Sequence, residues 1–374
     1  MSVPIRFIYR WDLDKTYLET DFRIHRIWQV PFQSAESRRN IPGAVALLRE
    51  LTRQRREPGQ ALAKAQVSFI SGSPRQLRSQ IEAKFKLDGL SPDALHLKPN
   101  LENLVRFRWR ALREQVGYKL PLLLEARVGA PVDVHEACFG DDSETDALIY
   151  SLYADLVAGK IGDFTLREMM RAAGAYPDAI LRARDARRRI HSAPAVDFII
   201  IHLAMQTPPE RFLSYGPRVI PVFDYFQAAL VLFGKGHLEA GGVVSVAYDM
   251  MARYGFGPRK LARSFKDIMR RGFFLHPDAL LLAEAVSSMQ FPSPLPPRED
   301  TVAFLRRLAE VVPTSVTPPP EPQNLDYPTL IESLRHKVRQ AEQRELLPEA
   351  LERAVLEAQA ALVSDHEDAF PDNV

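Results

Sequence analysis

The sequence has one cysteine, no long hydrophobic run and a net charge of only +2. A lone Cys138 excludes an internal disulfide and a cysteine-rich zinc site, and it favours a reducing, cytoplasmic location. No apolar run approaches the roughly 18 residues needed to span a bilayer. With 49 Lys and Arg against 47 Asp and Glu, no whole-molecule field attracts nucleic acid, so any charge-driven binding must be local.

The first 160 residues alternate short apolar runs with helical patterns. At 374 residues, 46% of them hydrophobic, the chain is long enough for two or three folding units. Alternation of strand and helix predicts an α/β domain with a mostly parallel sheet. The candidate strands are Ile5–Trp11, Val67–Ile70, Ala94–Leu97 and Val132–Phe139. The candidate helices are Pro42–Thr52, Pro74–Phe85 and Lys119–Val128, each with a proline in its first turn.

The strand signal disappears beyond residue 164, and helix-length segments then follow one another across Gly and Pro breaks to residue 289. This predicts an all-helical domain at 161–290 after the α/β domain at 1–160. Two proline clusters around a short helical pattern at 299–311 predict a linker at 291–328. Helical spacing predicts a further helix at 329–363, followed by an acidic tail at 364–374.

The first candidate strand ends in two aspartates, Asp12 and Asp14. Alternate residues of an extended segment point the same way, so both carboxylates can face a pocket at the carboxyl end of the strand, where open α/β sheets bind ligands. One carboxylate can then attack phosphorus while the other donates and later recovers a proton. The alternative is a polar loop, because this spacing often occurs by chance.

The second candidate strand leads through Ser71, Gly72, Ser73 and Pro74 into a helical pattern. Backbone N–H groups at such a helix start favour a phosphoryl group, and Ser71 adds a hydroxyl donor. We therefore expect Ser71 and Gly72 to bind substrate. The alternative is an ordinary serine N-cap with proline at the first helical position.

The fourth candidate strand ends in Gly140, Asp141 and Asp142, with Asp146 four residues further on. Clustered carboxylates supply the hard oxygen ligands that Mg²⁺ prefers. Unit charges about 4 Å apart repel by about 1 kcal/mol in water and about 4 kcal/mol at an effective dielectric constant of 20, so acids on adjacent strands need a cation. The alternative is a solvated acidic turn that caps a helix.

A phosphoryl group beside these acids also requires a fixed positive charge. Lys119 is the first candidate, because it begins the helix that precedes the strand ending before Asp141. Lys98, at the end of the third candidate strand, is the competitor, and Lys15 lies next to the paired aspartates.

Taken in order, these motifs resemble those of the haloacid dehalogenase-like (HAD) superfamily over about the first 155 residues. They are D-x-D-x-T at 12–16, the serine turn at 71, the lysine at 119 and G-D-D-x-x-x-D at 140–146. The resemblance implies a Rossmann-like domain with a minimal cap and a Mg²⁺-dependent phosphatase activity. It also implies that Asp12 is a nucleophile forming an aspartyl-phosphate and that Asp14 is the general acid and base.

The same resemblance assigns the remaining residues. Thr16 and Ser71 are implied to hydrogen-bond near the phosphoryl group, and Lys119 to steady its charge. The implied Mg²⁺ ligands are Asp12, the backbone carbonyl of Asp14 and Asp141, with Asp142 or Asp146 in support. Retention of Asp14 favours a phosphatase, since the dehalogenase branch lacks this second aspartate.

Within the superfamily, the S-G-S-P turn and the G-D-D-S-E-x-D segment are similar to the phosphatidate phosphatases of the actin-patch-associated type. Lys15 departs from that group, which usually has an acidic or small residue there, and the region from 164 onward lies outside the resemblance. The motif spacing leaves no room for a large cap domain, so the implied site admits a bulky substrate such as phosphatidate.

Two basic segments can recruit partners. Residues 259–270 predict a helix with a basic face and an apolar face, suited to peripheral contact with an anionic membrane, and 182–189 carry five arginines. The alternative for both is a solvated helix face. The alternative to an enzyme is a scaffold whose α/β domain is catalytically idle, but a scaffold has no physical need to gather uncompensated carboxylates.

Overall fold

The computed structural model describes residues 5–19, 38–53, 64–98, 111–143, 145–289, 298–311 and 324–344. The described residues contain a six-stranded sheet in the order β3-β2-β1-β4-β5-β6, in which every pair is parallel. The strands are β1 (Ile5–Trp11), β2 (Lys64–Pro74), β3 (Ala94–Lys98), β4 (His135–Asp141), β5 (Val196–His202) and β6 (Val219–Val222). The predicted α/β class is therefore confirmed.

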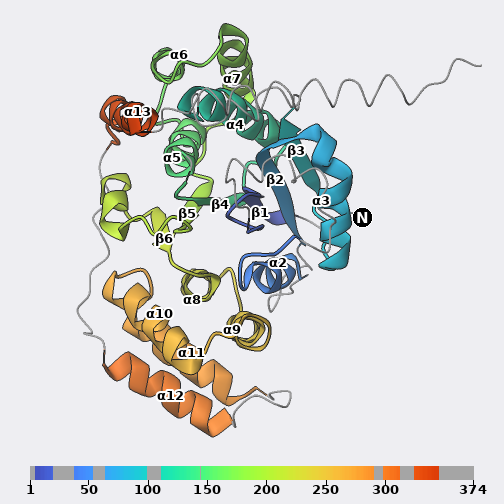
Figure 1. The fold of residues 1–374 in the computed structure, drawn as a ribbon, viewed down its shortest axis with the longest axis vertical. Coiled ribbons are helices and arrows are strands. Elements are labelled where there is room, and N and C mark those ends of the chain that lie inside the picture. Colours follow the sequence, from blue (N-terminus) through green and yellow to red (C-terminus); the bar gives the residue numbers. More distant parts are fainter. Residues whose placement is uncertain are drawn as a thin grey trace, which may run out of the picture.

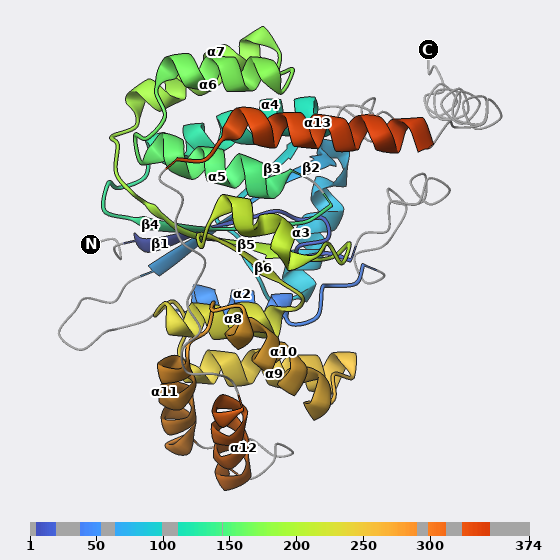
Figure 2. The same ribbon diagram turned by 90° about the vertical axis from the view of Figure 1, so that its left-hand side faces the viewer.

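Helices cover both faces of the sheet (Figures 1 and 2). Figure 2 shows one layer above the sheet, made of α4 (Ala111–Val128), α5 (Asp146–Val157), α6 (Asp163–Ala172), α7 (Pro177–Arg189) and α13 (Tyr327–Arg344). The layer below contains α2 (Ala44–Thr52), α8 (Tyr225–Gly234), α9 (Ala240–Tyr254), α10 (Pro258–Arg270), α11 (His276–Ser287) and α12 (Arg298–Glu310). The other helical elements are η2 (Arg75–Leu77), α3 (Arg78–Leu87) and η4 (Pro209–Tyr215).

Two apolar clusters fill the space between the sheet and these layers. Neighbouring residues of β4 belong to different clusters, because Phe139 packs on one face of the sheet and Cys138 on the other. Strands buried on both faces have nearly continuous apolar sequences, which explains why the first four strands were predicted close to their observed positions.

The prediction that residues 164–289 contain no strand is wrong. β5 and β6 lie in this segment and extend the sheet past β4, so the sheet crosses the predicted boundary at 160. β6 contains Pro221 and is an edge strand, where proline is tolerated. In the described chain, the all-helical region begins at Tyr225.

The predicted C-terminal elements lie partly outside the described residues. α12 corresponds to the short helix predicted at 299–311, and α13 to the first part of the helix predicted at 329–363. The two proline clusters of the predicted linker and the acidic tail at 364–374 fall largely or wholly in the segments that are not described. Among the described helices, none combines the length and apolarity required to cross a bilayer.

A buried ionic cluster joins the upper helices to the centre of the sheet. The Glu136 carboxylate accepts hydrogen bonds from Arg10 at 3.0 and 3.1 Å, Arg127 at 3.1 Å and Tyr153 at 2.7 Å. Burial raises the pKa of Glu136, but the charges and hydrogen bonds of Arg10, Tyr153 and Arg127 together outweigh burial and lower that pKa. Because Arg127 lies on α4, the cluster fixes this helix against β1 and β4.

Candidate active site

The candidate site lies where the strand order reverses direction. From β1 the chain adds β2 and β3 on one side, and then β4, β5 and β6 on the other. The helices that follow β1 and β4 lie on opposite faces of the sheet (Figure 2), and ligands of open α/β sheets bind at the carboxyl ends of the strands at such a reversal. Asp12 directly follows β1 and Asp141 ends β4, so the two predicted acidic motifs meet at this point.

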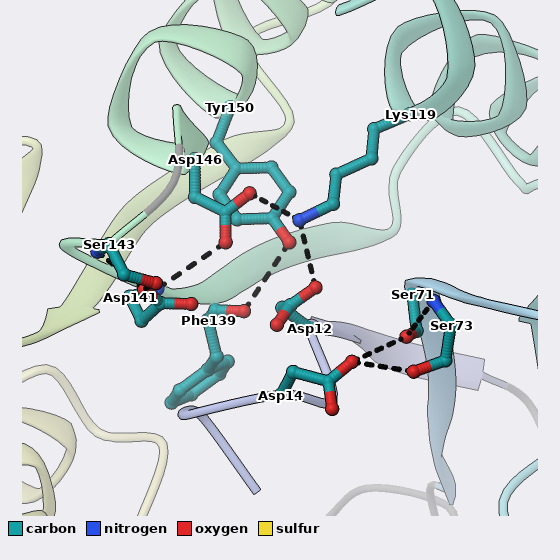
Figure 3. A network of polar contacts seen from close by, with 10 residues as sticks. All are labelled: Asp12, Asp14, Ser71, Ser73, Lys119, Phe139, Asp141, Ser143, Asp146 and Tyr150. Atoms are coloured by element: carbon teal, nitrogen blue, oxygen red, sulfur yellow. Dashed lines mark hydrogen bonds and ion pairs between the residues drawn. The ribbon is translucent and has the colours of Figure 1, made fainter. Parts of the chain in front are cut away.

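Lys119 joins two of the acidic side chains (Figure 3). Its ammonium nitrogen lies 2.8 Å from Asp12 Oδ1 and 2.6 Å from Asp146 Oδ1. The three side chains are at most 2% exposed, so water screens these charges little. The contacts bring together the end of β1, the start of α5 and the middle of α4.

Asp12, Asp141 and Asp146 form a buried group of carboxylates. Each offers one oxygen, and these oxygens lie within 4.8 Å of one another. The group depends on Gly140, because a Cβ at this position would lie 2.4 Å from Asp146 Oδ2. Glycine therefore lets the first residue of α5 pack against the end of β4. The donor set fits a hard divalent cation such as Mg²⁺.

Asp14 belongs to a second polar group beside the first. Its Oδ2 accepts hydrogen bonds from the Ser71 hydroxyl at 3.1 Å and from the Ser73 hydroxyl at 2.7 Å (Figure 3). Ser71 Oγ also accepts the Ser73 backbone N–H at 2.9 Å. The serine turn therefore holds the second aspartate of D-x-D rather than capping a helix, and Gly72 lies buried between the two serines in β2.

The loop after Asp12 is held by residues from beyond the predicted α/β domain. The Lys15 backbone is left-handed, with φ of 58°, and its carbonyl lies 2.7 Å from His202 Nδ1 at the end of β5. Since a carbonyl only accepts, Nδ1 carries the proton. The Tyr225 hydroxyl, at the start of α8, donates to the Thr16 carbonyl at 2.5 Å. The backbone carbonyls of Lys15 and Thr16 are thus held by side chains from β5 and α8.

Aromatic stacking supports the same loop from below. The Trp11 ring stacks on Phe139 with centroids 4.2 Å apart and on Tyr225 at 5.6 Å. Tyr225 stacks in turn on His202 at 5.7 Å. Burial, followed by the charges of Asp141 and Asp12, raises the pKa of Tyr225, so its hydroxyl remains protonated and continues to donate.

We expect Tyr225→Phe to lower kcat by about tenfold while KM changes little. The substitution keeps the stacked ring but leaves the buried Thr16 carbonyl without this donor, a loss of about 1 kcal/mol or slightly more. Because the hydroxyl is engaged by the backbone of the loop, we expect its loss to act on the position of the loop and therefore on kcat. Steady-state kinetics measures the change in kcat and KM, and thermal melting measures the loss of stability.

Tyr327→Phe is the matched control, because its hydroxyl donates to Asp155 at 2.7 Å, on α5 and outside the candidate site. Its melting temperature should fall by a similar amount with kcat unchanged. Equal losses of kcat in both variants would contradict a positioning role for Tyr225.

The structure separates the candidate lysines. Lys119 contacts the carboxylates, although it does not begin its helix as expected: α4 starts at Ala111 and contains Pro121 in its interior. Proline was interpreted as a start signal, but here the helix continues through it. Lys98 ends β3, two strands away from β1. The Lys15 ammonium lies 3.7 Å from Met205 Sδ.

Asp142 lies outside the group formed by Asp12, Asp141 and Asp146. Its carboxylate accepts the backbone N–H groups of Met205 at 2.7 Å and Thr207 at 2.9 Å. It therefore anchors the loop after β5 beside the site. Asp141 Oδ1 accepts the Ser143 backbone N–H at 2.5 Å, which shapes the turn into α5.

Sequence reasoning missed Ser73, His202 and Tyr225 as parts of the site. Ser73 stood in the predicted turn, and its spacing of two from Ser71 in an extended segment was the available signal, since alternate residues face the same way. His202 and Tyr225 had no local signal, because they contact residues 187 and 209 positions away.

One of three comparisons with known proteins found a match. Residues 11–168 match the family model described as phosphatidate phosphatase APP1, catalytic domain. The similarity to the actin-patch-associated phosphatidate phosphatases that the motifs indicated is thereby confirmed. The matched segment begins with the last residue of β1 and ends within α6, so it contains every predicted site residue. No curated protein and no solved structure gave a significant match.

The family match suggests a phosphatase that acts on a phosphorylated lipid. His202 and Tyr225 lie beyond the matched residues, although they hold the loop at 15–16. The matched segment therefore relies on β5 and α8 for the conformation of its first motif.

Proposed function

We propose that this protein is a Mg²⁺-dependent phosphatidate phosphatase of the HAD type, working through an aspartyl-phosphate. The observation that supports this most is the contact of Lys119 with Asp12 and Asp146 inside a group of buried carboxylates at the strand-order reversal. The transition state of phosphoryl transfer is anionic. A fixed positive charge beside carboxylates that can hold a metal ion is the arrangement that stabilises it.

Asp12 is the proposed nucleophile. One of its carboxylate oxygens attacks phosphorus, and the bond between phosphorus and the glycerol oxygen breaks. Asp14 donates a proton to that leaving oxygen, which releases diacylglycerol. A water molecule then attacks the phosphorus of the aspartyl-phosphate, Asp14 takes its proton, and inorganic phosphate leaves with the Asp12 carboxylate restored.

The serine turn supports Asp14 in this proposal. Two hydroxyl donors on one carboxylate oxygen fix the orientation of the group between its two proton transfers. The Thr16 hydroxyl is buried and has no hydrogen-bond partner within the described residues, so it is a candidate donor to a phosphoryl oxygen. Lys119 offsets the charge that builds up near Asp12.

The residues that would hold Mg²⁺ are Asp12, Asp141 and Asp146, with the Asp14 backbone carbonyl as a further candidate ligand. When bound, the ion supplies electrostatic stabilisation of phosphoryl oxygens. Asp142 is a weaker candidate, because its carboxylate is engaged by the loop after β5.

The proposed function is tested by phosphate release from phosphatidate in mixed micelles and from a soluble aryl phosphate. We expect release in millimolar Mg²⁺, loss of release in EDTA and recovery when Mg²⁺ is restored in excess. Addition of Mg²⁺ should also raise the melting temperature, since a ligand at 100 times its Kd stabilises the folded state by about 2.7 kcal/mol. Absence of release from both substrates at every metal concentration would refute the proposal.

A further inference from the structure

The apolar face of α10 is used in packing. Leu261, Phe265, Ile268 and Met269 are buried in the lower cluster. This face is therefore not available for insertion between lipids, as an amphipathic helix lying in a bilayer would require. The opposite face of the helix carries the charge.

The charged face of α10 is largely exposed, and its one electrostatic contact with an acid among the described residues is the interaction of Lys260 with Asp224. Arg259, Lys260, Arg263 and Arg270 are exposed, and Lys266 is half-buried. The single acid of the helix, Asp267, pairs with Arg271 at 2.6 Å instead. Within the described part of the chain, none of these five basic residues takes part in an ion pair, so the face carries a concentrated positive charge.

The other arginine-rich helix, α7, differs in this respect. Arg182 pairs with Glu125 at 2.8 Å, Arg188 with Asp163 at 3.1 Å and Arg189 with Asp185 at 3.0 Å. Its charge is largely offset by neighbours. Both segments are rich in basic residues, but of these two helices α10 is the one whose basic side chains form no ion pairs with the described residues.

α10 is anchored at the edge of the sheet that carries the candidate site. The Ser264 hydroxyl donates to Asp224, which links β6 to α8, and Gln227 donates to the Ser264 carbonyl at 2.9 Å. Tyr225, the residue after Asp224, donates to the loop that follows Asp12. Met205, 59% exposed in the loop after β5, lies at the same edge.

We propose that the basic face of α10 docks on an anionic lipid bilayer and turns the carboxyl edge of the sheet toward it. The positive charge of this face complements anionic headgroups. Docking through α10 would bring Asp12 near a substrate that resides in the same bilayer. This benefit to catalysis rests on the proposed function. The contact is electrostatic, which makes it sensitive to salt.

The test compares two triple variants of the full chain that remove the same charge. Arg259→Gln, Lys260→Gln and Arg263→Gln neutralise α10, while Arg182→Gln, Arg188→Gln and Arg189→Gln neutralise α7. Sedimentation with phosphatidylcholine vesicles containing 30% phosphatidylserine measures binding at low salt. We expect the α10 variant to bind on the order of a hundredfold more weakly than wild type, and the α7 variant to bind nearly as wild type.

Phosphate release from vesicle phosphatidate and from a soluble aryl phosphate separates docking from chemistry. The α10 variant should lose most vesicle hydrolysis and keep soluble hydrolysis. If wild type hydrolyses neither substrate, the proposed function fails while the binding difference still supports docking. Docking would be overturned if wild type and the α10 variant bound vesicles equally, or if both triple variants lost binding to the same extent. It would also be overturned if wild type bound RNA or heparin but did not bind vesicles.

Discussion

Asp12→Asn is expected to reduce phosphate release by at least about a thousandfold, with the protein still folded. An amide cannot form the aspartyl-phosphate, and loss of a nucleophile costs a hydrolase most of its rate. The fold should tolerate the change, because Lys119 keeps its contact with Asp146 at 2.6 Å. The loss of one negative charge also relieves repulsion among the clustered carboxylates. Phosphate release and thermal melting in EDTA are the measurements.

Asp142→Asn is the matched control for metal binding. Asp142 has the same side chain and lies next to Asp141, but its carboxylate holds the loop after β5 rather than joining the acidic group. Asp12→Asn should abolish the rise in melting temperature caused by Mg²⁺, and Asp142→Asn should retain it. Retention of full activity by Asp12→Asn, or loss of the Mg²⁺ response in Asp142→Asn alone, would contradict the assignment.

The residues that the sequence predicted well are those whose signals are local. Asp12, Asp14 and Asp141 stand directly at the ends of apolar strands, and parallel strands bring their carboxyl ends to one edge. Ser71 follows the same rule from β2. Strand alternation and motif order therefore suffice to predict that these side chains meet.

The features of the fold and the site that the sequence did not predict depend on tertiary contacts. β5 and β6 were missed because both lie among the helix-length segments beyond residue 164, and Pro221 interrupts the apolar run of β6. The position of Lys119 within α4 was also wrong, since Pro121 is compatible with a helix start and the helix extends past it. Neither His202 nor Tyr225 has a sequence pattern that indicates the loop it holds.

Loss of Lys119 should destabilise the fold strongly in the absence of metal. Lys119→Met keeps the length and apolar character of the stem but removes the charge between Asp12 and Asp146, both fully buried. Removing one partner from a buried ion pair costs about 3–5 kcal/mol, because the remaining charge has neither water nor a counter-ion. In EDTA we expect the melting temperature to fall by roughly 10 °C.

Mg²⁺ should reverse most of this loss, because a cation held by Asp12, Asp141 and Asp146 replaces the missing ammonium charge. The Mg²⁺-induced rise in melting temperature should therefore be larger in Lys119→Met than in wild type, although activity stays low without the charge beside Asp12. Lys84→Met is the control, since Lys84 of α3 is also a buried lysine and pairs at 2.7 Å with Asp88, the residue that follows the helix, outside the acidic group. Its stability should fall less and its response to Mg²⁺ should equal that of wild type. An unchanged melting temperature for Lys119→Met in EDTA would show that the carboxylates do not depend on this cation.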